Sequence, residues 1–129
     1  LENALRLSVN TFESAVLINN ESFFDFKPLP NYAQFSSTND IIIQDFNNDN
    51  INDIVLVGNM YHAEIETTRT DSGNGLLLQG IGNGDFKEIS VSKSGFFAPG
   101  DSKKIISLKS KNDNLLIIAN NDDRLQIFK

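Results

Sequence analysis

Residues 45–57 read DFNNDNINDIVLV, a polar loop that leads directly into an apolar run. The loop, residues 45–53, carries an Asp or Asn oxygen at its first, third, fifth and ninth positions. A hard cation such as Ca²⁺ takes about six to eight oxygens at about 2.3–2.6 Å, and alternate side chains of a tight loop can converge on one point. The loop therefore predicts a Ca²⁺ site, and the apolar run predicts a buried strand.

The predicted ligands are the backbone carbonyl oxygen of Ile51 and the side-chain oxygens of Asp45, Asn47, Asp49 and Asp53. Asn50 is expected at the sharp bend, because after Gly it is the residue that best tolerates a positive φ. An EF-hand fits poorly, since Leu56 stands where an EF-hand loop has Glu, and Zn²⁺ is disfavoured because the loop 45–53 contains neither His nor Cys. Mg²⁺ and a metal-free solvated turn remain as alternatives.

Working outward from this stretch, the apolar pattern predicts an all-β chain. Runs 54–57, 76–78 and 115–118 are apolar at every position, which is typical of strands covered on both faces. Residues 24–27 and 86–89 alternate, as strands with one solvated face do. The expected strands are 5–9, 15–19, 23–29, 41–45, 53–59, 75–80, 85–90, 103–109, 114–119 and 124–128.

The pattern recurs with a step of about sixty residues, so that 16–19 corresponds to 76–79 and 54–59 corresponds to 115–120. Units of four strands with buried inner strands are typical of β-propeller blades. On this division, residues 36–92 form one complete blade, between partial blades at 1–35 and 93–129. The second copy replaces the cation loop by the short connection 110–114, so we expect it to have lost the metal.

Size and charge narrow the function classes. With 129 residues and 40% apolar content, the chain is expected to form one domain. A net charge of −6 argues against nucleic-acid binding, which needs clustered Lys and Arg. No apolar run reaches the ~20 residues that span a bilayer, and the sequence opens Leu1-Glu2-Asn3-Ala4 without the pattern of a signal peptide.

The long connection from Met60 to Asn74 is a second candidate site, because long ordered connections are often functional. Its possible surface contacts with a sugar or a peptide are Tyr61, Glu66, Arg69 and Asp71. The alternative is a structured loop in which Arg69 pairs with a carboxylate and Tyr61 covers the core. No catalytic residue is assigned, since His62 has no nucleophile motif nearby and nothing sets the separation of a carboxylate pair.

Residues 45–57 resemble the FG-GAP/VCBS repeat family, whose blades carry a loop of the form Asp-x-Asp/Asn-x-Asp-Gly-x-x-Asp before an apolar strand. Asn50 departs from that form, where the family usually has Gly. The stretch 58–129 is similar to the C-terminal end of bacterial ASPIC/UnbV-associated VCBS proteins. The segments that carry this likeness are GNMY (58–61), RTD (69–71), GLLL (75–78) and ANNDDRLQIF (119–128).

The resemblance implies an exported protein, in the periplasm, on the cell surface or outside the cell, of which this chain is a C-terminal piece. It implies a Ca²⁺-braced propeller segment acting as a non-catalytic binding or scaffolding module for a protein or a glycan. A carbohydrate-active lyase or hydrolase and an adhesion module remain as alternatives. Because blades stabilise one another by stacking, we also expect apolar faces at both ends and self-association.

Overall fold

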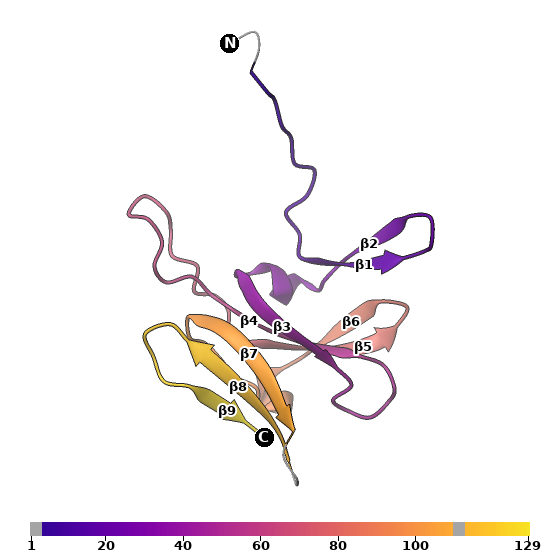
Figure 1. Ribbon diagram of the computed structural model, residues 1–129, viewed down its shortest axis with the longest axis vertical. Coiled ribbons are helices and arrows are strands. Elements are labelled where there is room, and N and C mark those ends of the chain that lie inside the picture. Colours follow the sequence, from indigo (N-terminus) through magenta and orange to yellow (C-terminus); the bar gives the residue numbers. More distant parts are fainter. Residues whose placement is uncertain (1–3, 110–112) are drawn as a thin grey trace.

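The computed structural model describes residues 4–109 and 113–129, so the predicted connection 110–114 lies largely outside the described residues. The described chain is all-β, in three antiparallel sheets of which none closes on itself (Figure 1). The first sheet holds β1 (Ala15–Asn19) and β2 (Phe24–Pro28). The second holds β3 (Thr38–Gln44), β4 (Asp53–Gly58), β5 (Leu76–Gly82) and β6 (Asp85–Ile89). The third holds β7 (Ser102–Lys109), β8 (Asn114–Asn120) and β9 (Gln126–Phe128).

Two short helical turns connect these sheets. The 3₁₀ turn η1 (Asn31–Gln34) follows β2, and the single-turn helix α1 (Val91–Ser94) follows β6. Pro30 precedes η1 as its N-cap, which suits proline at the start of a helical turn. Within the described ranges, no helix has the length and apolar character needed to cross a bilayer.

Every strand predicted from residue 15 onward is present, with ends shifted by a few residues at most. The strand predicted at 5–9 is wrong: these residues run as an extended segment without a paired neighbour and stand away from the sheets (Figure 1). Leu5 and Leu7 are 83% and 84% exposed. Their alternating pattern is that of a strand, but a strand needs a partner for its backbone groups and a face to cover.

Strand β4 is buried along its whole length, which confirms the prediction of a strand covered on both faces. On one face, Val55 and Val57 pack in a cluster with Ile105 and Ile118 of the third sheet. On the other face, Ile54 and Leu56 pack with Leu29, Ala33 and Leu78, and Val16 of the first sheet contacts this cluster. The four-stranded sheet is therefore the middle layer of three, with one sheet on each side.

The hairpin β5–β6 turns at Asn83 and Gly84, both with positive φ (55° and 75°), as the turn residues predict. The hairpin β1–β2 approaches this turn closely, since a Cβ on Gly84 would lie 2.4 Å from Ile18 Cδ1. Lys27 Nζ completes the contact with a 3.0 Å ion pair to Asp85. The two hairpins recur without a gap, since β1 and β2 start at residues 15 and 24 and β5 and β6 at residues 76 and 85. The connection 20–23 is longer only because β1 ends earlier than β5.

The two outer faces of this stack carry apolar side chains. Strand pairing aligns Ile106 with Ile117 and Ile117 with Ile127, on the face of the third sheet opposite to its packed face. Ile106, Leu108 and Ile127 are 48%, 49% and 62% exposed. At the other end, Leu17 pairs with Phe26 on the outer face of the first sheet, and both are exposed. The expected uncovered apolar faces are thus present at both ends.

Candidate functional site

The predicted cation loop connects β3 to β4 at one edge of the middle sheet. Its first three predicted ligands gather around one backbone amide. The N–H of Asp49 donates to Asp45 Oδ1 at 3.2 Å and to Asn47 Oδ1 at 2.9 Å. Asn47 Nδ2 also donates to Asp49 Oδ2 at 2.8 Å. The loop therefore brings the oxygens of Asp45, Asn47 and Asp49 together, as alternate positions of a tight turn should.

The backbone of the loop bends back twice to allow this convergence. Asn48 and Asn50 have φ values of 61° and 66°, which confirms the bend predicted at Asn50. The amide of Asn50 donates to Asp45 Oδ2 at 2.9 Å, and that of Ile51 donates to Asp49 Oδ1 at 2.8 Å. Carboxylate oxygens thus accept hydrogen bonds from the loop amides, which have no neighbouring strand to pair with.

Asp53, the last predicted side-chain ligand, is the anchor of the loop. It is buried, and its two carboxylate oxygens accept hydrogen bonds from the amides of Phe46 at 3.0 Å and Gly80 at 2.9 Å. A side chain at Gly80 would collide with the loop, because a Cβ there would lie 2.3 Å from the carbonyl oxygen of Asn52. Asp53 therefore ties the loop to β5.

The donor set fits a hard cation, since it consists of carboxylate, carboxamide and carbonyl oxygens only. Hydrogen bonds bring the oxygens of Asp45, Asn47 and Asp49 together, whereas the Asp53 carboxylate accepts from the amides of Phe46 and Gly80. Within residues 4–109 and 113–129, no three His, Cys, Asp or Glu side chains are grouped as a metal centre. The three predicted carboxylates, those of Asp45, Asp49 and Asp53, therefore do not form such a group in this structure.

No match to this chain was found among protein-family models, curated proteins or solved structures. Its function is therefore proposed from its own residues and their geometry.

The connection 60–74 makes ordered contacts within itself and with Pro99. An isolated bridge pairs Met60 with Thr70, and Tyr61 Oη donates to the carbonyl oxygen of Pro99 at 2.6 Å. The Arg69 guanidinium lies 4.0 Å from the centre of the Tyr61 ring, and its Nε donates to Asp71 at 2.9 Å. Tyr61, Arg69 and Asp71 thus lie together, with Arg69 paired to a carboxylate, whereas Glu66 is exposed and forms no part of this group.

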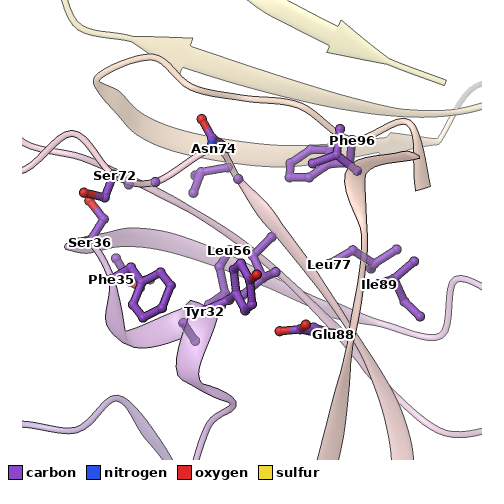
Figure 2. A pocket seen from close by; sticks show the side chains of 18 of the residues that line it. Tyr32, Phe35, Ser36, Leu56, Ser72, Asn74, Leu77, Glu88, Ile89 and Phe96 are labelled. Atoms are coloured by element: carbon purple, nitrogen blue, oxygen red, sulfur yellow. The ribbon is translucent and has the colours of Figure 1, made fainter. Parts of the chain in front are cut away.

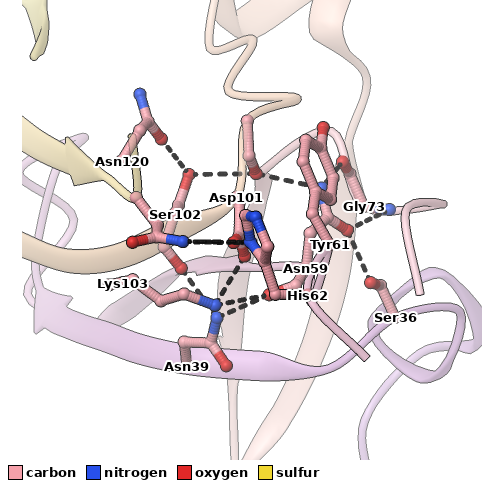
Figure 3. Close-up of polar contacts among 12 residues, drawn as sticks. Ser36, Asn39, Asn59, Tyr61, His62, Gly73, Asp101, Ser102, Lys103 and Asn120 are labelled. Atoms are coloured by element: carbon pink, nitrogen blue, oxygen red, sulfur yellow. Dashed lines mark hydrogen bonds and ion pairs between the residues drawn. The ribbon is translucent and has the colours of Figure 1, made fainter. Parts of the chain in front are cut away.

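Asn59 organises a polar network that sequence reasoning missed (Figure 3). Its side chain is fully buried and its φ is 85°. Oδ1 accepts hydrogen bonds from Ser36 Oγ at 2.6 Å and from the amide of Gly73 at 2.9 Å. Nδ2 donates to the carbonyl oxygens of Gly73 and Pro99 at 2.7 and 2.9 Å. Asn59 thus joins the end of β4 to the connection 60–74 and to the segment that leads into β7.

Asp101 lies at the centre of the neighbouring part of this network (Figure 3). Its carboxylate is 3% exposed, pairs with Lys103 and accepts a 3.3 Å hydrogen bond from Asn121 Nδ2. His62 Nδ1 lies 3.8 Å from the same carboxylate. Burial by itself would raise the pKa of Asp101. The hydrogen bond and positive charge of Lys103 lower it, as do hydrogen bonds from Asn121 and from the Tyr61 amide. The lowering effects are larger, so the pKa of Asp101 lies below its usual value.

Asp40 on β3 plays a similar part between the second and third sheets. Its carboxylate accepts a 2.8 Å hydrogen bond from the amide of Ile105 and pairs with Lys104 at 3.0 Å. Desolvation raises the pKa of Asp40, but these contacts and the amide of Ile41 prevail and lower it. This contact could not be predicted from the sequence, because Asp40 and Ile105 are far apart in the chain and meet only when the two sheets stack.

Proposed function

We propose that this chain is a Ca²⁺-binding segment of β-propeller type, in which residues 36–92 form one blade and the first and third sheets belong to its neighbours. It works as a non-catalytic binding or scaffolding module of an exported protein, and its partner is a protein or a glycan. The ion braces the loop between β3 and β4. The export and the family assignment rest on the resemblance of residues 45–57 and 58–129 to FG-GAP/VCBS and ASPIC/UnbV-associated sequences.

The stacking of three sheets supports the propeller assignment. The β3–β6 sheet is an antiparallel meander in sequence order, and its two inner strands are covered on both faces. Blades of a propeller stack in this way, each burying the face of the next. The third sheet repeats the first three strands of the meander, with β7, β8 and β9 in the same order.

One observation carries the calcium proposal. Asp45 Oδ1 and Asn47 Oδ1 both accept from the single amide of Asp49, so side-chain oxygens from alternate positions converge within a loop of nine residues. Oxygens held this close together can serve a hard cation as several ligands at once. The ion therefore stabilises the loop, and the loop holds β3 and β4 in register.

Calorimetry and thermal melting test the calcium proposal. We expect Ca²⁺ to bind with one site per chain and to raise the melting temperature, because an ion that binds only the folded loop stabilises it by mass action. Asp49→Ala should abolish both effects, and Mg²⁺ should act more weakly. Asp122→Asn is the matched control, since Asp122 lies in another exposed turn with positive φ (54°). No heat of binding and no shift of melting at millimolar Ca²⁺ would refute the site.

The outer apolar faces support self-association. Each end of the stack presents a sheet face of the kind that the middle sheet buries on both sides. Exposed apolar faces of this extent are typical of interaction surfaces. We propose that a second copy of the chain covers them, with the third sheet of one copy stacking on the first sheet of another.

A further inference from the structure

A pocket of about 240 Å³ opens between η1, the start of β3 and the β5–β6 hairpin (Figure 2). The buried Leu56 and the neighbouring Leu76 and Leu77 give it an apolar inner wall. Pockets for drug-sized ligands span about 300–1,000 Å³. This smaller volume suits a ligand of about one ring.

Two aromatic side chains stand at the mouth of the pocket. Tyr32 and Phe35 are 60% and 55% exposed, with ring centres 5.2 Å apart and planes inclined by 43°. Single exposed aromatic residues need no explanation, but two beside the same hollow offer a ligand an apolar surface. They lie on and just after η1, so the short helical turn positions both.

The polar groups of the pocket point to a ligand with hydroxyl groups. Ser36 and Ser72 lie near each other at one end, and the Glu88 carboxylate points toward Tyr32 (Figure 2). Glu88 is the one charged residue among those that line the described pocket.

We infer that this pocket binds one ring of a neutral carbohydrate. A pyranose has an apolar C–H face and a rim of hydroxyl groups, which match an aromatic wall beside acceptors and hydroxyls. The ring packs against Tyr32 and Phe35, and its hydroxyls donate to Glu88. The charge of Glu88 disfavours anionic sugars. The inference rests on the proposed function as a binding module and names the ligand class, but it does not depend on calcium.

Ligand-observed and ¹⁵N-edited NMR titrations test this inference with four neutral probes: the methyl glycosides of glucose, galactose and mannose, and N-acetylglucosamine. We expect at least one to bind at millimolar concentration and to shift the amide signals of Ser37, Gly73 and Glu88. Tyr32→Ala should weaken that binding about fivefold, the effect of losing one aromatic contact. Glu88→Gln should weaken it in the same direction.

Matched variants outside the pocket control for general effects. Phe24→Ala removes another exposed aromatic side chain, and Glu21→Gln removes another exposed carboxylate, so both should bind the glycosides like the original chain. Melting curves check that each variant folds. Glucuronate and cyclohexanol serve as anionic and apolar comparison probes, and both should bind more weakly.

The inference is overturned if no neutral glycoside shifts the pocket signals, if cyclohexanol binds as well as the glycosides, or if Tyr32→Ala leaves binding unchanged. If the glycosides do not bind but Ca²⁺ still stabilises the chain, the carbohydrate inference is wrong and the proposal of a calcium-braced module stands. If a glycoside binds but Ca²⁺ neither binds nor stabilises the chain, the carbohydrate inference stands and the calcium proposal is wrong.

Discussion

Asn59 and Gly73 exchange two hydrogen bonds. The side-chain amide of Asn59 pairs with the backbone of Gly73 as a backbone amide of a neighbouring strand would. Nδ2 donates to the carbonyl oxygen of Gly73 at 2.7 Å, and the amide of Gly73 donates to Oδ1 at 2.9 Å. A side chain at Gly73 would lie 2.7 Å from Oδ1, so only glycine permits the approach. This pair closes the connection 60–74 against the end of β4.

Replacing Asn59 should therefore be costly. We expect Asn59→Ala to lower the free energy of unfolding by about 3–4 kcal/mol, because it leaves several buried donors and acceptors without partners. Urea denaturation measures the change. Asn83→Ala is the matched control, since Asn83 also has a positive φ but lies in an exposed turn; it should cost only about 1 kcal/mol. Equal losses in the two variants would contradict the role of the network.

The bend at Asn50 makes a separate prediction about the calcium loop. With φ at 66°, Asn50→Gly should leave stability within about 0.5 kcal/mol, and Asn50→Ala should cost about 1 kcal/mol, because alanine resists this conformation. Both are measured by urea denaturation in the presence of chelator, so that metal affinity does not contribute. Asn52→Ala, at an exposed position in the same loop, is the control and should be near neutral.

The lowered pKa of Asp101 makes the free energy of unfolding depend on pH in a defined direction. Its folded pKa lies below the usual 3.8, so the folded state binds fewer protons than the unfolded state near that pH. The stability it contributes is complete above the unfolded pKa and is lost as the pH falls through the folded pKa. Asp40 acts in the same direction, because its pKa is lowered too.

Asp101→Asn should accordingly lower stability by about 1–3 kcal/mol at pH 7, and the difference from the original chain should shrink as the pH falls below about 4. Denaturation at a series of pH values measures this. Asp71→Asn removes a partner from an exposed ion pair and should change stability by no more than about 0.5 kcal/mol. A constant difference at every pH would contradict the assignment.

The outer face of the third sheet predicts concentration-dependent association. Ile106→Lys with Ile127→Lys should shift sedimentation toward the monomer, because charges on that face cannot be buried against a second copy. Ile65→Lys is the control, since Ile65 is exposed on the loop 60–74, away from both faces. A chain that is already monomeric at all concentrations would remove the proposal of stacking between copies.

Much of the fold follows from local pattern. The run at residues 54–57 is apolar at every position, and β4 is indeed covered on both faces. Asn83-Gly84 and Asn50 stand where the chain needs positive φ. Residues 5–9 show where such patterns fail, because alternation describes a strand but cannot supply the neighbour that pairs with it.

Within the candidate sites, the sequence by itself determined the oxygen donors of the loop at 45–53, because ligands at alternate positions of one turn are close whatever the rest of the chain does. Only the tertiary structure decided the positions of Asp53 against Gly80, of Asp40 against Ile105, and of the pocket beside Tyr32 and Phe35. These contacts join segments far apart in the chain. They exist because apolar burial stacks three sheets, and no local pattern specifies which side chains that stacking brings together.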